Sequence, residues 1–177
     1  MGKTHKEVNR TNIISGPCRS FTVGEREVGG TQEGVEVEFT NEYEAQTTDE
    51  MLDAAYLDKV GTQMVVKTAL AEATLENLKL AWALNGDIVE NPTEGTETLK
   101  IGMDSSVKEM SLEFIGPAPN GKERTYTVYR AVQMSASAHS IKKGEKQVFP
   151  VEFRILPDTT KPRGEEYGLI VDRTISE

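Results

Sequence analysis

The chain has 177 residues, and its 20 Lys and Arg against 29 Asp and Glu give a net charge of −9. This balance argues against tight binding to nucleic acid or anionic lipid, because basic side chains supply most of that affinity. The single cysteine, Cys18, excludes an intramolecular disulfide and a zinc site of several thiolates. No stretch approaches 18 apolar residues, so we expect no signal peptide and no membrane anchor, in a protein made in a reducing cytosol.

The clearest periodic pattern follows a polar segment, Met1–Asn12, which we expect to be a flexible arm. From residue 35 to residue 45, apolar and polar side chains alternate with a period of two, which predicts a half-buried strand. The apolar set, which we expect to face the core, is Val35, Val37, Phe39, Tyr43 and Ala45. The acidic set, which we expect on the outer face, is Glu36, Glu38, Glu42 and Glu44. A solvated strand face is the ordinary interpretation of such a row, but its like charges repel, which costs stability unless the surface has a use.

The next segment predicts a helix. Thr47-Thr48-Asp49-Glu50 fits a capping box, and the helix would end at Gly61, before a strand at Thr62–Leu70. A long excursion between two strands with an exposed apolar stripe is typical of a protein contact. The candidate contact residues are Met51, Leu52, Tyr56 and Leu57.

A second helix is predicted after Thr74, closed by Asn85-Gly86, and the rest of the chain predicts strands. One buried strand face is expected from Phe149, Val151, Phe153 and Ile155, and a last short strand at Tyr167–Val171. Seven or eight strands with two short helices predict a mainly β protein, an antiparallel β-sandwich or barrel with one or two flanking α-helices. We expect one domain over residues 1–177, with an arm at about 1–12 and a C-terminal loop and strand at about 157–177.

The sequence offers little for catalysis. His5 and His139 are expected to be surface residues, and Cys18 has no base or oxyanion site near it in the sequence. No nucleophile elbow, zinc-protease motif or phosphate-binding loop occurs. We therefore expect no enzymatic activity, no cofactor and no metal site.

The order of these features resembles the major tail tube proteins of long-tailed bacteriophages. The similarity covers most of residues 30–172. It rests on the strand at 35–45, the acidic and apolar excursion at 47–60, and the strand at 62–70. It continues through the helix opening Ala-Glu-Ala-Thr-Leu-Glu-Asn-Leu-Lys-Leu-Ala (71–81) and the late segment Phe-Pro-Val-Glu-Phe-Arg-Ile-Leu-Pro-Asp (149–158).

The resemblance implies a structural virion protein, similar in fold to type VI secretion tube proteins. Six copies would form a ring whose strands close into one inner barrel, and the rings would stack into a tube that conducts DNA during ejection. The implied partners are further copies of the chain and the tape-measure, tail-tip and tail-terminator proteins. DNA would pass an acidic lumen without specific binding, and the protein, made in the host cytoplasm, would end in the virion tail.

Several points stay open on the sequence alone. The four glutamates are our candidate lumen residues, but a polar row of Thr125, Thr127, Gln133, Ser135 and Ser137 is an alternative lining. Basic residues near the ends of an acidic chain predict contacts with acidic surfaces of neighbouring copies. These residues are Lys3, Lys6, Arg10, Lys161 and Arg163. The alternative functions are a soluble β-sandwich module that binds a ligand or a protein, and a type VI secretion tube subunit.

Overall fold

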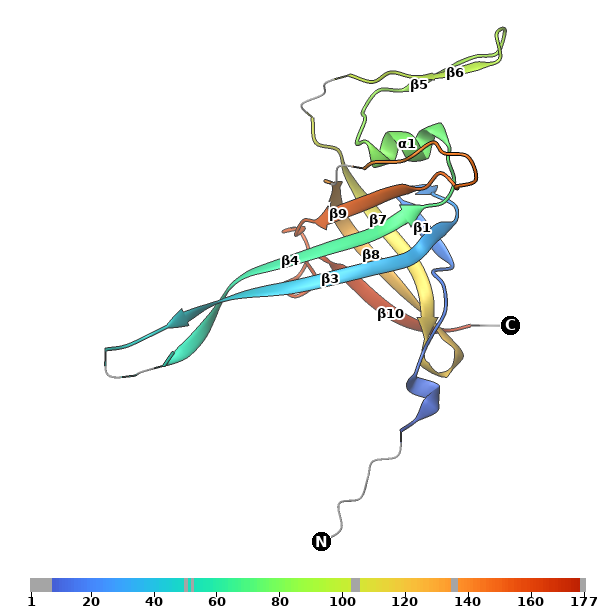
Figure 1. Ribbon diagram of the computed structural model, residues 1–177. Helices are drawn as coiled ribbons and strands as arrows, with labels where there is room; N and C mark the ends of the chain where they lie inside the picture. Colours follow the sequence, from blue (N-terminus) through green and yellow to red (C-terminus); the bar gives the residue numbers. More distant parts are fainter. Residues whose placement is uncertain (1–7, 50, 52, 103–105, 135–136, 176–177) are drawn as a thin grey trace.

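The computed structural model describes residues 8–49, 51, 53–102, 106–134 and 137–175 (Figure 1). The predicted mainly β, antiparallel fold is confirmed. The strands are β1 (Ser20–Val23), β2 (Arg26–Glu27), β3 (Thr31–Gln46), β4 (Tyr56–Leu70), β5 (Ile88–Asn91), β6 (Thr96–Leu99), β7 (Glu109–Ala118), β8 (Lys122–Gln133), β9 (Phe149–Ile155) and β10 (Gly168–Thr174). The helical elements of the described residues are α1 (Leu75–Ala81) and two 3₁₀ turns, η1 (Arg10–Asn12) and η2 (Pro119–Gly121).

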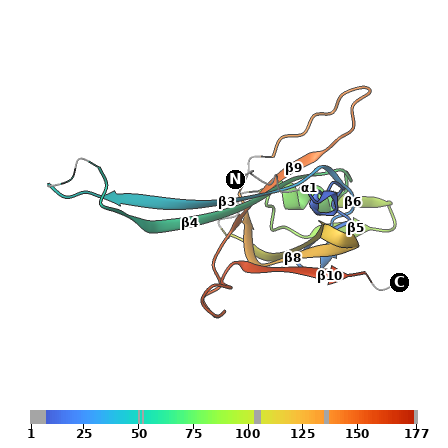
Figure 2. The same ribbon diagram turned by 90° about the horizontal axis from the view of Figure 1, so that it is seen from below.

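One large antiparallel sheet runs in the order β2-β1-β7-β8-β9-β4-β3. Two strands pair with the same edge of β8: β10 pairs with its residues 122–128, and β9 pairs with its residues 131–133. The sheet therefore divides at β8 and folds over itself. Figure 2 shows β3, β4 and β9 in one layer and β8 and β10 in the other. Strands β5 and β6 form a separate two-stranded hairpin beyond α1 (Figure 1).

The core lies between the two layers. The predicted buried face of β9 is confirmed, since Phe149, Val151, Phe153 and Ile155 are all buried. The ring of Phe153 lies 6.2 Å from that of Phe21 on β1, so the rings connect the two layers. Burial of such side chains stabilises the fold by about 1.5–3 kcal/mol each.

Helix α1 covers one end of the core and begins as the sequence predicts. The Thr74 side chain accepts a hydrogen bond from the backbone N–H of Asn77 at 3.2 Å. The predicted end at Asn85-Gly86 is wrong, because Ala83 takes the left-handed conformation with φ 52°. The N–H groups of Ala83 and Leu84 bond the carbonyls of Leu80 and Lys79, which completes a Schellman motif.

A buried asparagine fixes α1 to the sheet. Asn77 is 1% exposed, and its Nδ2 donates to the carbonyls of Val28 and Glu72 at 2.9 Å each. Its Oδ1 accepts from Arg26 of β2 at 2.8 Å. Because every polar atom of this side chain has a partner, its burial costs little and orients the helix against the β1–β2 turn.

Candidate assembly surfaces

Strands β3 and β4 form a long hairpin that leaves the body of the molecule (Figures 1 and 2). The two strands pair from Thr31↔Leu70 out to Gln46↔Tyr56. Strand β9 supports β4 only over Met64–Leu70, so beyond that point the hairpin strands pair only with each other in the described part of the chain. We call residues 40–63 the arm. Since the arm lacks a second layer, it projects as an exposed two-stranded ribbon.

The predicted helix after Thr47 is wrong. The described residues between Gln46 and Tyr56 form a loop that closes the hairpin, and Tyr56 begins β4. The Ala55 N–H bonds the Gln46 carbonyl at 2.8 Å, which closes the ladder at the position where the sequence predicts helix. Glu50 of the capping box and the contact candidate Leu52 lie outside the described residues. Pairing with β3 has overridden the local capping signal, as tertiary context often does.

The four predicted outer glutamates share one face of β3, which we call the acidic face (Glu36, Glu38, Glu42 and Glu44). All four are exposed. Near the body, Lys67 of β4 lies opposite Glu36 and bonds Glu38 at 2.7 Å, and this hydrogen bond raises the pKa of Lys67. Farther out, Glu44 lies opposite Asp58, so carboxylates face each other across the ribbon. The acidic face therefore becomes more negative toward the tip.

The face of the hairpin opposite the glutamates is apolar and exposed, which corrects the sequence-based placement of Val37, Phe39, Tyr43 and Ala45 in the core. Val35 packs on the core, but Phe39 is 56% and Tyr43 57% exposed. Leu57 of β4 lies across from Ala45 on this face and is 63% exposed. The alternation is right, but the strand runs past the end of the body, so its apolar side chains have no second layer to cover them in the described structure.

Two features hold the base of this apolar face. The Phe39 ring meets Tyr167, just before β10, edge-on at 6.4 Å, and the Tyr167 hydroxyl donates to the Thr62 carbonyl at 3.3 Å. A bulge between Glu42 and Tyr43 bends the ribbon, and Gly61 lies opposite Glu42 there. A Cβ on Gly61 would come within 2.8 Å of the Glu42 carboxylate, so a larger residue here would require that exposed side chain to move.

The tip of the arm carries the other predicted contact residues. Met51 is 54% and Tyr56 60% exposed, so with Leu57 they present apolar surface at the far end of the ribbon. Tyr56 lies opposite Gln46 and Leu57 opposite Ala45, so these two side chains point to opposite faces of the ribbon. Exposed apolar side chains on both faces make the tip a candidate for a protein contact.

Two long sheet edges are unpaired within the part of the chain that the structure describes. One is the outer edge of β3, and the other is the outer edge of β10, which pairs with β8 on its other side. Arg124 binds both carboxylate oxygens of Asp172 at 2.6 and 2.8 Å, and this contact lowers the pKa of Asp172 and fastens β10 to β8. Ile170 of β10 is 63% exposed. Exposed edges are templates for pairing with another chain.

The alternative polar row on and after β8 does not form one surface. Thr125 and Thr127 are half-buried opposite Val171 and Leu169 of β10. Gln133 is buried and donates to the Ala81 carbonyl of α1 at 2.6 Å. Ser137 is half-buried, and Ser135 lies outside the described residues. Sequence alternation alone missed this because α1 covers the end of β8 but not its beginning.

The basic residues near the two ends of the chain, which we expect to contact neighbouring copies, have different surroundings. Lys3 and Lys6 lie outside the described residues, while Arg10 is exposed in η1 at the end of the molecule near η2. Lys161 places its ammonium 4.5 Å from the centre of the Tyr129 ring, a contact within the same chain. Arg163 is exposed in the loop before β10. Contacts of these residues with other copies stay a prediction.

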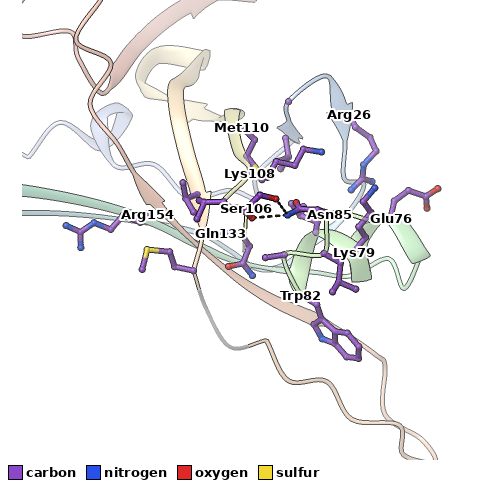
Figure 3. A pocket seen from close by; sticks show the side chains of 18 of the residues that line it. Arg26, Glu76, Lys79, Trp82, Asn85, Ser106, Lys108, Met110, Gln133 and Arg154 are labelled. Atoms are coloured by element: carbon purple, nitrogen blue, oxygen red, sulfur yellow. Dashed lines mark hydrogen bonds between the residues drawn. The ribbon is translucent and has the colours of Figure 1, made fainter. Parts of the chain in front are cut away.

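A groove that the sequence did not reveal lies between the C-terminal end of α1, the start of β5 and the adjoining ends of β7 and β8. Its volume is about 1130 Å³. Its apolar lining includes Leu80, Leu84, Ile88, Val107 and Met110. Asn85 closes part of the wall by donating to Ser106 at 2.9 Å, as Figure 3 shows. Trp82 also borders the groove, but Figure 3 shows its indole pointing away from the other labelled side chains. The indole ring contacts that of His139 at 5.7 Å between ring centres.

The described residues bring no evident reactive groups together. Cys18 is half-buried, its thiol donates to the Ser20 carbonyl at 3.1 Å, and burial raises its pKa. His139, expected on the surface, is half-buried between the rings of Trp82 and Phe149. No group of three or more His, Cys, Asp or Glu able to hold a metal occurs in the described ranges. His5 lies outside those ranges.

No protein-family model matches the chain, and no match is found among the curated proteins. Within the described part of the chain, no helix combines the length and apolar character needed to cross a membrane.

Proposed function

We propose that this protein is a structural subunit that assembles with further copies of itself into rings and stacked tubes, as a phage tail tube protein does. The proposal is carried by a single observation: among the residues that the structure describes, the long outer edges of β3 and β10 are unpaired, and an arm projects from the same molecule. Pairing the β3 edge of one copy with the β10 edge of the next is a head-to-tail contact. Such contacts close into rings when the rotation between copies allows it.

The side chains of these elements support an assembly role. The arm exposes the apolar residues Tyr43 and Leu57, and Phe39 is exposed at its base; these side chains would lose contact with water against a neighbouring copy. The hexameric ring, the virion location and the tape-measure, tail-tip and terminator partners are drawn from the family resemblance.

The acidic face gives the tube a candidate lumen. If Glu36, Glu38, Glu42 and Glu44 line the channel of a closed ring, the row repeats around each ring and along the stack. The field of such a channel repels phosphate, so a duplex would pass without a strong binding site.

The experiment is negative-stain electron microscopy of the purified full chain over a range of concentrations, with size-exclusion chromatography beside it. We expect rings or hollow tubes that become more abundant with concentration. The matched variant deletes residues 49–56 at the tip of the arm, which would leave the β body folded and abolish the tubes. A monodisperse monomer at every concentration, or tubes of normal length from the deletion, would contradict the proposal.

The groove beside α1 favours a second candidate, a β-sandwich module that binds a ligand or a protein. Such a module would remain a small species at every concentration and would keep its binding activity after removal of the arm. The same chromatography therefore separates the two functions.

A further inference from the structure

The groove beside α1 has apolar walls that a ligand would cover. Leu84, Ile88 and Met110 line it and are each only half-buried, so further burial of these side chains is favourable. Pockets for drug-sized ligands have volumes of roughly 300–1,000 Å³, so a groove of about 1130 Å³ has room for an alkyl chain of about ten carbons. Among the described residues, none from β3, β4 or β10 lines the groove, so it is separate from the surfaces proposed for assembly.

The charged residues of the groove wall are mostly basic, although the chain has a net charge of −9. These residues are Arg26, Lys79, Lys108, Arg154, Glu25 and Glu76. Figure 3 places three of them, which we call the basic cluster (Arg26, Lys79 and Lys108), around the hydrogen bond between Asn85 and Ser106. Glu76 and Arg154 point away from the other labelled side chains in the same view, and Glu25 is exposed on the β1–β2 turn. The charge of the basic cluster complements an anion.

Lys79 is the member of the basic cluster best placed to bind an anion. Its side chain is only 21% exposed, and its Nζ lies 3.8 Å from Oδ1 of Asp87, beyond hydrogen-bond distance. The Asp87 side chain is 98% exposed, so water screens this pair and the pair contributes little. A carboxylate in the groove would accept a charge-assisted hydrogen bond from Lys79 in a less hydrated setting, where such bonds are stronger. Arg26, in contrast, already donates to Asn77 at 2.8 Å.

We propose that the groove binds a monocarboxylate with an unbranched alkyl chain, its carboxylate on Lys79 and its chain along Leu84, Ile88 and Met110. Such a ligand matches both parts of the wall. A purely apolar molecule would leave the basic cluster without a counterion, and a small anion would leave the apolar wall in water. The inference rests on the second candidate function, the ligand-binding module, whose ligand class it names, and it does not depend on tube assembly.

The test is isothermal titration calorimetry of the full chain with decanoate, kept below its micellar concentration. We expect one decanoate per chain. Decylammonium has the same alkyl chain with the opposite charge, and it should bind about tenfold or more weakly because the basic cluster repels it. Hexanoate keeps the carboxylate, and it should also bind about tenfold or more weakly because less alkyl chain is buried.

Two pairs of variants locate the site. Lys79→Met keeps the apolar stem but removes the ammonium, so it should weaken decanoate binding about tenfold and abolish the preference over decylammonium. Lys122→Met, at the end of β8 far from the groove, is its matched control and should change nothing. Ile88→Asp places a carboxylate in the wall and should weaken binding about tenfold or more, whereas Val89→Asp, outside the lining, should not.

Circular dichroism checks that the variants fold. If Lys79→Met or Ile88→Asp does not fold, the methyl shifts of Leu84 and Ile88 in the unaltered chain report the site instead, and decanoate should move them. Decanoate and decylammonium that bind equally well, or a Lys79→Met chain that binds decanoate as tightly as the Lys122→Met chain, would overturn the inference.

The outcomes also separate this inference from the proposed functions. Rings or tubes from a chain that binds no decanoate would overturn the inference and leave the tube function standing. Decylammonium that binds more tightly than decanoate and moves the Ile88 methyl shifts would overturn the anionic ligand and leave the ligand-binding module standing. Decanoate binding in the groove by a chain that stays a small species at every concentration would support the inference and remove the tube function.

Discussion

Substitutions on the apolar face of the arm should weaken assembly much more than they destabilise the isolated subunit. Tyr43→Ala together with Leu57→Ala removes two side chains that are 57% and 63% exposed, so the isolated subunit loses little. Neighbouring side chains on a two-stranded face contribute roughly 0.2–1 kcal/mol, and the free energy of unfolding should fall by no more than that. The matched core variant, Phe153→Ala, removes a side chain that is 0% exposed and should cost about 3–5 kcal/mol.

The effect on assembly should be larger than the effect on folding. A fully buried side chain of this size stabilises by about 1.5–3 kcal/mol, so covering the exposed 57% of one and 63% of the other contributes roughly 2–3.5 kcal/mol per contact. At 1.4 kcal/mol per tenfold, the concentration needed for assembly should rise about 30- to 300-fold. Urea unfolding measures the first quantity, and light scattering against concentration measures the second. An unchanged assembly threshold in the double variant would refute the assignment of this face to a contact.

Three other changes test separate parts of the structure. Asn77→Ala leaves the Val28 carbonyl without its buried hydrogen bond and removes the partly buried one to Glu72, so it should lower the free energy of unfolding by about 2–3 kcal/mol in a urea titration; a loss within 0.5 kcal/mol would show that these hydrogen bonds do not fix α1. The pKa of Asp172 is lowered, so its contribution is complete above the ordinary aspartate pKa of about 3.9 and is lost as the pH falls through the lowered value. The protection factors of the β10 amides, relative to the intrinsic exchange rate at each pH, should therefore fall at low pH, and Asp172→Asn should abolish this dependence. Lysine at all four positions of the acidic face should make tubes retain DNA, whereas glutamine at all four should not. Equal DNA release by both variants would exclude the acidic face from the lumen.

The strands of the body could be predicted because their local pattern and their packing agree. In β9, apolar side chains alternate and the strand lies between β4 and β8, so every predicted core residue is buried. The Thr74 cap was also predictable, since the N-cap hydrogen bond involves residues three apart. In both cases the information needed lies within a few residues of sequence.

The arm could not be predicted in the same way. The alternation around Phe39 and Tyr43 predicts that these side chains share a face. It does not predict that the pairing of β9 with β4 ends at Met64, which leaves that face uncovered beyond this point. Likewise, the capping signal after Thr47 is local, while the ladder that ends at Gln46↔Tyr56 gains from pairing along the whole ribbon. The end of α1 depended on Ala83, a residue type that rarely takes a positive φ. The groove is lined by residues from elements that lie far apart in the sequence, so no short sequence motif predicts it.

The central claim, that the free edges of β3 and β10 pair between copies, is tested most directly by hydrogen exchange. Assembled particles and dissociated subunits of the same preparation are compared by mass spectrometry of peptides from β3 and β10. We expect both strands to become protected on assembly, while β8, which pairs with β7 on one edge and with β10 and β9 on the other, changes little. Particles in which β3 and β10 exchange as fast as they do in the free subunit would contradict the account.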